Sequence, residues 1–407
     1  MQHNFLPVIL GSDENAYGFA RAFYESYGIK STLICGRRLV PTQFSKILNI
    51  EQINDFDTPE VFVRKLTDFA KSRTEDLLLI PCSDRYTELA VKNQAALAPY
   101  YKNKFISEDL LNQFITKEKF YALCDKYNLR YPKTVICAYE NRLTAADSLP
   151  FDFPIVVKAN NSNGYEFLNC SFEGKKKAFF VKSKEEYIKI ITEMNKSDYK
   201  DNLIIQEDIT GADTNMKVIT CYSDGGGKVR LMCLGRPALE EYTPSAIGNY
   251  AAIITDYDEK LYEKIKNFLE DIGYVGFSNF DLKYDAKTGE YVFLDLNPRQ
   301  GRSSFFVTAV GYSLAEFLTR DVIYGEENPT VYGKNEHLWL TVPKAILRKY
   351  VFDKEVSEQI ERLIKEKKYD YTLFYKKDLN ILRYLKMLRY LNRHHKNYKR
   401  YFFRKDI

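Results

Sequence analysis

The feature that most constrains the fold of this chain is a pair of short alternating runs, GFSNFDLKYD at 276–285 and EYVFLDLN at 290–297. The turn-forming residues AKTG lie between them, so we expect a β-hairpin. Side chains two positions apart on a strand point the same way, and Asp295 and Asn297 therefore share a face. The hairpin can bring both of them next to Asp281 on the first strand.

Three oxygen-bearing side chains beside a guanidinium favour a magnesium site. Mg²⁺ prefers oxygen ligands, keeps several waters and usually takes its remaining ligands from substrate phosphates. Arg299 follows Asn297 by two residues and offers a planar fork for a transferring phosphoryl group. An acidic hairpin edge with a solvated turn is the alternative interpretation.

The same pattern, an aromatic residue, Asn, Phe and an acid followed by YVFLDLNPR, resembles the metal-binding hairpin of the ATP-grasp superfamily. Members of this superfamily join a carboxylate to an amine through an acyl phosphate. The resemblance implies that Asp281, Asp295 and Asn297 hold Mg²⁺, with Mn²⁺ as an alternative metal. It also implies that Arg299 steadies the γ-phosphate and the transition state that resembles the acyl phosphate.

Composition narrows the class of protein. The chain has 407 residues, long enough for roughly two or three domains, and no run approaches the ~20 apolar residues of a membrane span. The seven cysteines include no C-x-x-C pair, which argues against a disulfide framework and a zinc site. The four histidines lie far from any Ser or Cys elbow, so we expect no imidazole-based nucleophilic catalysis. No signal-peptide pattern is present, and we expect a cytoplasmic protein.

Strands that alternate with helices predict a parallel α/β domain in residues 1–115. The apolar runs FLPVIL, STLICG and LLLIP are its expected strands. Loops after such strands usually hold ligands, which makes Asp13, Asn15 and Asp84 candidates, with turn and N-cap roles as the alternative. The first turn lacks the G-x-G-x-x-G fingerprint, which argues against a nicotinamide dehydrogenase.

Two lysines are candidates for the phosphates of ATP. The segment TKEKFYALCDKYNL predicts a helix, and the ATP-grasp resemblance places a phosphate-binding lysine at Lys117, with Lys119 as its rival. The strand FPIVVK ends in Lys158, and a cation that closes a buried strand needs a partner such as a phosphate. The resemblance places its second ATP lysine there. The polar loop at 160–164 could fold over phosphates, and Lys177 could face the site or lie in a solvated turn.

The segment LIIQEDITGAD resembles the adenine hinge of the superfamily. That hinge pairs with adenine chiefly through backbone groups, so its side chains can vary. The resemblance assigns Gln206, Glu207 and Ile209 to the adenine side. It assigns Asp213 to the ribose hydroxyls, since a carboxylate can accept two hydrogen bonds. Gln206 departs from the usual acid and Asp208 from the usual aromatic residue.

Substrate contacts are expected in two segments. GRPALEEYTP is charge-dense and marked by prolines, which suits a substrate-facing loop with Arg236 and Glu241 as candidates, or a plain surface loop. After the hairpin, QGRSS is expected to open a helix that runs to Leu318, and the N–H groups at a helix start favour an anion. Arg302 and Ser303 there could grip the carboxylate of an amino acid.

The net charge of +5 is unevenly distributed, because residues 376–407 carry eleven Lys or Arg and only two Asp. A helical period puts apolar residues on one side, Ile381, Tyr384, Leu385, Leu388 and Leu391, and basic residues on the other, Arg383, Lys386, Arg389 and Arg393. Such a helix fits the inner face of an anionic membrane or a phosphate-bearing partner. Packing on the domain with a solvated basic face is the alternative. No nucleic-acid recognition module accompanies it, and we expect no nucleic acid partner.

Three matches in the superfamily's order cover roughly residues 117–304. We therefore predict an α/β protein with an ATP-grasp fold, ATP and Mg²⁺ as cofactors, and charge neutralisation by Lys158 and Arg299 during carboxylate–amine ligation. The predicted parts are an N-terminal parallel α/β domain (1–115), a nucleotide-binding and catalytic domain with central and C-terminal ATP-grasp subdomains (116–330), and an extension with a basic helical tail (331–407).

Within the superfamily, PVILGSDENAYGFARAFYESYGIKS, the segments LEEYTP and AIGNYAA, and the basic tail are similar to bacterial D-aspartate ligases. This resemblance implies D-aspartate or a similar amino acid as the acid. The implied acceptor is a lysine amine of a nucleotide- or lipid-linked peptidoglycan precursor, in the cytoplasm or at the inner membrane face. The alternatives are another ATP-grasp ligase, acting on a dipeptide or a surface polymer, and a non-catalytic nucleotide-binding, membrane-associated scaffold.

Overall fold

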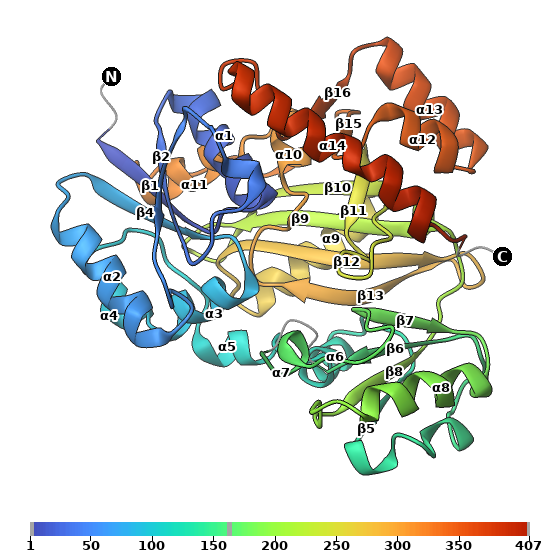
Figure 1. Cartoon of the computed structure of the whole chain (residues 1–407). Coiled ribbons are helices and arrows are strands. Elements are labelled where there is room, and N and C mark those ends of the chain that lie inside the picture. Colours follow the sequence, from blue (N-terminus) through green and yellow to red (C-terminus); the bar gives the residue numbers. More distant parts are fainter. Residues whose placement is uncertain (1–3, 161–164, 405–407) are drawn as a thin grey trace.

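The computed structural model describes residues 4–160 and 165–404 and confirms the predicted mixed α/β fold (Figure 1). Within these residues the strands form three sheets. A parallel sheet lies near the N-terminus, and a large, mostly antiparallel sheet occupies the centre. A small antiparallel sheet forms a lobe of its own in the lower part of Figure 1.

The N-terminal sheet is parallel throughout its described strands, which follow the order β3-β2-β1-β4. The three predicted strands are confirmed, and an edge strand joins them: β1 (Phe5–Leu10), β2 (Ser31–Cys35), β4 (Asp76–Pro81) and the edge strand β3 (Leu48–Gln52). Helix α1 (Glu14–Tyr27) begins where the Asp13 carboxylate accepts a hydrogen bond from the backbone N–H of Ala16. Helix α3 (Asp84–Lys92) begins after Ser83 in the same way. Both helices therefore start at the carboxyl edge of the sheet.

The large sheet follows the order β13-β12-β9-β10-β11-β15-β16 among the described residues, and β14 pairs with β10. Its strands are β9 (Met216–Ser223), β10 (Val229–Glu240), β11 (Tyr250–Asp256), β12 (Gly276–Asp285), β13 (Glu290–Asn297), β14 (Val331–Tyr332), β15 (Leu338–Leu340) and β16 (Tyr369–Tyr371). The predicted hairpin is confirmed as β12 and β13, with Asp281 opposite Asp295 and Asn279 opposite Asn297. Helix α9 (Glu259–Asp271) packs on the face of the sheet away from these four residues.

The small sheet follows the order β5-β8-β6-β7, and its described pairs are antiparallel. Its elements are β5 (Thr134–Cys137), β6 (Ile155–Ala159), β7 (Ala178–Val181), β8 (Leu203–Glu207) and the helix α8 (Lys184–Asn195). The helix buries Tyr187, Ile191 and Met194 against one face of the sheet. The alternation of side chains leaves Lys158 and Gln206 on the other face.

Two predicted segments differ from the structure. The segment 235–244, predicted as a loop, is strand as far as Glu240 because β11 pairs with it. The single helix predicted to run to Leu318 is two helices, α10 (Phe305–Ala309) and α11 (Leu314–Val322). Gly311, with a φ of 107°, separates them, and Ser313 caps the second. Arg302 therefore lies in a turn before a short helix, so the argument from a helix start does not apply to it.

The segment predicted as a C-terminal extension shares the core of the catalytic part. Strands β15 and β16 belong to the large sheet, and the helices α12 (Lys344–Tyr350) and α13 (Lys354–Lys365) pack against it. Leu338 and Val356 lie in one apolar cluster with Ile254 of β11. Among the residues that the structure describes, no helix is long and apolar enough to cross a membrane.

The predicted basic helix is confirmed as α14 (Ile381–Tyr401), but its orientation differs from the prediction. It packs on the domain through Arg383, Met387, His394 and Tyr398, which are buried. Arg383 was expected on the solvated side and instead forms an ion pair with Asp378. The first turn of the expected packing face is exposed to solvent instead.

Candidate active site

A cavity of about 300 Å³ lies between the small sheet and the β12–β13 edge of the large sheet. Strands β6 and β8 form one wall, and the hairpin with the turn that follows it forms the other. Most of the polar and charged residues singled out in the sequence line this cavity: Lys117, Lys158, Lys177, Glu207, Asp208, Asp281, Asp295, Asn297, Arg299, Arg302 and Ser303. Residues from the two strands and from the turn, widely separated in sequence, therefore converge on one space.

The hairpin places two carboxylates side by side. The pKa of Asp281 is raised to about 6 by burial and by the charge of Asp295. Tyr250 donates a hydrogen bond of 2.7 Å to Asp281, and Asn297 Nδ2 donates one of 3.3 Å. A divalent cation would relieve the repulsion between the carboxylates, and the donor set of two carboxylates and an amide fits Mg²⁺.

No group of three His, Cys, Asp or Glu side chains in the described parts of the chain is placed to hold a metal ion. The hairpin supplies two carboxylates, Asp281 and Asp295, and the amide of Asn297. Magnesium sites with few protein ligands take the others from water and substrate phosphates. These three ligands therefore suit a metal ion that is also coordinated by a nucleotide, rather than a metal ion coordinated by the protein alone.

Lys117 and Lys158 approach the hairpin from two different elements. Lys117, at the start of α6 (Lys117–Lys126), lies 2.5 Å from Asp295 and donates a hydrogen bond of 3.0 Å to the carbonyl of Leu294. Its rival Lys119 is exposed and does not line the cavity. Burial and the charge of Lys117 lower the pKa of Lys158 to about 7. An ammonium group in such surroundings favours an anionic ligand.

The three residues predicted for the adenine side, Gln206, Glu207 and Ile209, all line the cavity. Gln206 Nε2 donates hydrogen bonds of 2.8 Å to Tyr121 and to Thr134, so its amide ties β8 to its neighbours. Of the polar loop at 160–164 that was predicted to fold over the phosphates, residues 161–164 lie outside the described residues.

The structure does not bring Asp213 to the cavity. Its carboxylate accepts hydrogen bonds from the backbone N–H of Glu240 at 2.9 Å and from the hydroxyl of Tyr242 at 2.7 Å. Sequence reasoning missed Glu240, which lines the cavity at the end of β10. Its only sequence signal was its position next to Glu241. The hinge pattern could not show which acid lines the cavity, because the short helical turn at Asp213–Asn215 after β8 redirects the chain.

Arg299 connects the hairpin to the N-terminal domain. Its Nε lies 2.6 Å from the carboxylate of Asp84, and its Nη2 is 3.4 Å from Asn297 Oδ1. The carboxylate of Asp84 offsets the burial of the guanidinium and raises the pKa of Arg299. Asp84 thus orients Arg299. The sequence predicted Asp84 as a candidate for ligand binding and did not predict this contact.

Arg302 lies among buried acids. Its Nη2 is 3.1 Å from Glu241 and 3.8 Å from Glu14. Burial raises the pKa of Glu14 to about 7 despite the nearby charge of Arg302. Glu241 does not line the cavity itself but holds Arg302, which does.

The N-terminal candidates Asp13 and Asn15 serve the fold around the cavity. Asp13 is the N-cap of α1. Asn15 Nδ2 donates hydrogen bonds to the carbonyls of Cys82 and Gln300, and its Oδ1 accepts one from Ser304. Gln300 in turn donates to the carbonyl of Pro81. These bonds fix the turn that carries Arg302 against the N-terminal sheet.

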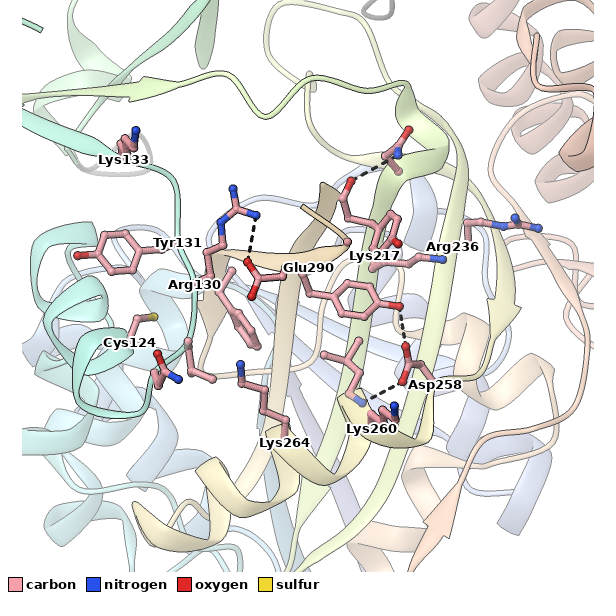
Figure 2. Close-up of a pocket in the computed structure, with 18 of the residues that line it drawn as sticks. Cys124, Arg130, Tyr131, Lys133, Lys217, Arg236, Asp258, Lys260, Lys264 and Glu290 are labelled. Atoms are coloured by element: carbon pink, nitrogen blue, oxygen red, sulfur yellow. Dashed lines mark hydrogen bonds and ion pairs between the residues drawn. The ribbon is translucent and has the colours of Figure 1, made fainter. Parts of the chain in front are cut away.

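Arg236 lies away from the cavity, because it points to the other face of the large sheet. It lines a wider groove of about 1380 Å³ there, together with Arg130 and Lys217 (Figure 2). Arg130 is paired with Asp285, and Lys217 is paired with Asp256. The smaller cavity, where the charged groups of the hairpin meet two lysines, is therefore the better candidate site.

The fold and the site together define an ATP-grasp carboxylate–amine ligase. No family model matches the chain. A D-aspartate ligase of Enterococcus faecium (strain Aus0004) is 42% identical to it, over 99% of this chain and 98% of the relative. The chain belongs to the D-aspartate ligase family.

Solved structures agree with this fold at low sequence identity. An L-amino acid ligase from Bacillus licheniformis is 13% identical, with a TM-score of 0.56, over 79% of this chain and 75% of that one. An N5-carboxyaminoimidazole synthetase from Staphylococcus aureus, complexed with ADP, is 11% identical, with a TM-score of 0.61, over 83% and 82%. The predicted ATP-grasp fold is thereby confirmed.

Proposed function

We propose that this ligase activates the carboxylate of D-aspartate with ATP and joins it to an amine. The observation that carries the proposal is the meeting of Asp281, Asp295 and Arg299 with Lys117 and Lys158 in one cavity. Carboxylates for a metal and cations for phosphates are what phosphoryl transfer requires. The relative in Enterococcus faecium, which carries the name D-aspartate ligase, supports the choice of acid.

The roles of the residues follow from their positions. Lys117 and Lys158 bind the phosphates of ATP, and Gln206, Glu207 and Ile209 line the adenine end. Asp281, Asp295 and Asn297 would hold Mg²⁺, which would shield the phosphate charges when bound. Arg299, held in place by Asp84, stabilises the phosphoryl group as it moves to the substrate carboxylate. The amine then displaces phosphate, and the protein supplies no nucleophile of its own.

The amino acid substrate lies beside Arg302 in this proposal. D-aspartate has two carboxylates, and only one of them is activated. Arg302 and Ser303, which line the cavity next to Arg299, bind the other. Glu241 and Glu14 limit the freedom of the Arg302 guanidinium. Glu240 at the end of β10 lines the cavity and is the candidate for a ribose contact, in place of Asp213.

The acceptor that we propose is an amine of a nucleotide- or lipid-linked peptidoglycan precursor. The family to which the chain belongs supports this choice. We place the reaction in the cytoplasm, where ATP is available, at the inner membrane face when the acceptor is linked to lipid. No role for nucleic acid enters the proposal.

Phosphate release from Mg-ATP across a panel of D- and L-amino acids tests the proposal. D-aspartate is expected to stimulate phosphate release more than any other acid. An added lysine-bearing muropeptide is expected to increase turnover and to become joined to D-aspartate. Binding of ATP is measured on the same preparation. If ATP binds and no acid stimulates phosphate release, the ligase proposal is wrong. That result would favour the alternative of a non-catalytic nucleotide-binding scaffold. If L-aspartate or another acid stimulates equally, the assignment of D-aspartate is wrong.

A further inference from the structure

The first turns of α14 expose large apolar side chains to solvent. Ile381 is 78% exposed, Leu382 62% and Leu385 59%. Tyr384 between them is also exposed. Single exposed apolar residues are ordinary, but several on consecutive turns of one helix form a patch, and such patches mark interaction sites. In Figure 1 the helix lies across the outside of the molecule.

A buried ion pair prevents this helix from turning its apolar face inward. Arg383 and Asp378 are 3.1 Å apart, and both side chains are fully buried. Arg383 also donates hydrogen bonds to the carbonyls of Pro41 and Gln43. Rotating the helix to bury Leu382 and Leu385 would expose that pair and leave backbone acceptors without partners. The exposure of the apolar turn is therefore built into the packing.

The loop beside the start of α14 continues the patch. Asn380 Nδ2 donates a hydrogen bond of 2.8 Å to the carbonyl of Phe44. Phe44 is 46% exposed and Leu39 38% exposed. Phe44 also has a φ of 59°, an unfavourable backbone conformation for an aromatic residue. Two separate segments thus present apolar side chains next to one another.

Cations surround these apolar residues, and accessible acids are missing from both segments. Exposed basic residues are Arg37, Arg38 and Lys46 in the loop and Lys376, Lys377, Arg389, Arg393 and Lys396 around α14. Over the described residues 36–46 and 376–404 the only acid is Asp378, which is buried against Arg383. We call the residues Leu39, Phe44, Ile381, Leu382, Tyr384 and Leu385, with these cations, the outer face.

We propose that the outer face docks the protein on an anionic lipid bilayer, with the apolar side chains among the acyl chains and the cations at the headgroups. The combination of one sign of charge with large apolar side chains on a surface helix fits an interfacial helix. A protein partner of mixed charge would be expected to meet exposed acids as well as cations on a patch of this size, and the described residues of these two segments include no exposed acid. The inference goes beyond the ligase chemistry and does not depend on it.

Docking would bring the active site close to the membrane, because the far end of α14 touches the wall of the cavity. Tyr398 donates a hydrogen bond to the carbonyl of Glu240, and His394 lies 3.9 Å from Glu241. The same helix therefore reaches from the outer face to the residues that hold Arg302. A substrate linked to lipid would meet the enzyme already in place.

Co-sedimentation of the full-length protein with vesicles tests the docking. One set contains phosphatidylcholine alone, and the other contains equal parts of phosphatidylcholine and phosphatidylglycerol. Wild type is expected to bind only the anionic set, and to bind less at high salt. Two variants, Ile381→Ser/Leu382→Ser/Leu385→Ser and Lys376→Glu/Lys377→Glu/Arg389→Glu, are each expected to bind at least about tenfold more weakly.

The matched control is Leu143→Ser, because Leu143 is an exposed leucine outside the outer face. It is expected to bind vesicles as wild type does, and all three variants should keep the amino-acid-stimulated phosphate release of wild type in solution. Failure of wild type to bind anionic vesicles would overturn the proposal. So would unchanged binding by the triple serine variant. If wild type dimerises in the absence of vesicles and the triple serine variant does not, the outer face binds a second copy of the chain instead, and the proposal is wrong.

Discussion

Two ion pairs of this chain lie in opposite surroundings. Lys117 and Asp295 are 2.5 Å apart on the wall of the cavity, with side chains 16% and 40% exposed. Arg383 and Asp378 are 3.1 Å apart with both side chains 0% exposed, and Asp378 also accepts hydrogen bonds from Tyr17 and Ser45. The first pair can exchange partners for a ligand at little cost, whereas the second cannot be opened without loss of structure. In this protein the fully buried pair supports the fold, whereas the partly exposed pair on the wall of the smaller cavity belongs to the candidate site.

The largest effect expected from this comparison is the loss of activity in Asp295→Asn. Removing the charge weakens the metal site, so kcat should fall about 1000-fold, or ~4 kcal/mol in activation free energy. The free energy of unfolding should change by no more than about 1 kcal/mol, because the pair is partly solvated. Phosphate release and denaturant unfolding of the same preparation measure the two effects.

The control for that variant is Asp256→Asn. Asp256 is paired with Lys217 on the other face of the sheet and is exposed to a similar extent. It is expected to leave kcat within a few fold of wild type. If both variants lose activity equally, the contrast between site pair and structural pair fails.

Arg383→Met should destabilise the folded state and leave the catalytic rate of folded molecules unchanged. Removing one partner leaves Asp378 buried without its cation, which should lower the free energy of unfolding by about 3–5 kcal/mol. The kcat per folded molecule should stay unchanged, since Arg383 does not line the cavity. Denaturant unfolding and active-site titration with a tight-binding nucleotide separate the two quantities. A kcat that falls in the folded fraction would contradict the assignment of this pair to the fold.

Lys117→Ala and Lys119→Ala sharpen the comparison within one helix turn. Lys117 reaches Asp295 and the cavity, and Lys119 does not. Loss of a charge-assisted contact to a phosphate should weaken ATP binding by about 10- to 100-fold in Lys117→Ala. Lys119→Ala should bind as wild type does. Calorimetric titration with ATP and Mg²⁺ measures both, and equal loss in the two variants would mean that helix integrity, not the cavity lysine, was measured.

The smallest expected effect is a pH dependence of nucleotide binding. The pKa of Lys158 is lowered to about 7 by burial and by Lys117, so its ammonium is present below that pH and is lost above it. ATP binds the charged form, and its dissociation constant should therefore rise toward about tenfold per pH unit above 7. In Lys158→Arg, which stays charged, the dissociation constant should be nearly flat over the same range. A flat profile for wild type would show that Lys158 does not meet the phosphates.

Local patterns in the sequence predicted the fold and the placement of most charged residues correctly. The hairpin, the strands of the N-terminal sheet and the helix at Lys117 are fixed by alternation, turn residues and caps that lie within a few positions of each other. The structure also brings Lys158, Arg299 and Arg302 to one cavity. Their proximity followed from the order of the matches and could not have been derived from spacing alone.

The residues placed differently depend on contacts distant in sequence. Asp213 is drawn away from the cavity by Glu240 and Tyr242. Helical periodicity gave α14 an apolar packing face, but Asp378 pulls Arg383 inward and fixes the opposite orientation. The position of Arg236 also depends on a distant contact. The pairing with β11 extends β10 through this residue and sets which side chains of β10 face the cavity. A one-dimensional pattern does not contain these partners.

The bonds that tie Asn15 and Ser304 to the turn at Gln300 have a consequence for recombination between related genes. A chimaera that takes its first 115 residues from a relative receives Asn15 and Pro81 from that relative but keeps Gln300 and Ser304 of this chain. The hydrogen bonds between the two segments must then form between residues of different origin. The N-terminal part should therefore be exchangeable only together with residues 298–304. Two segments almost three hundred residues apart in the sequence are therefore expected to be exchanged together.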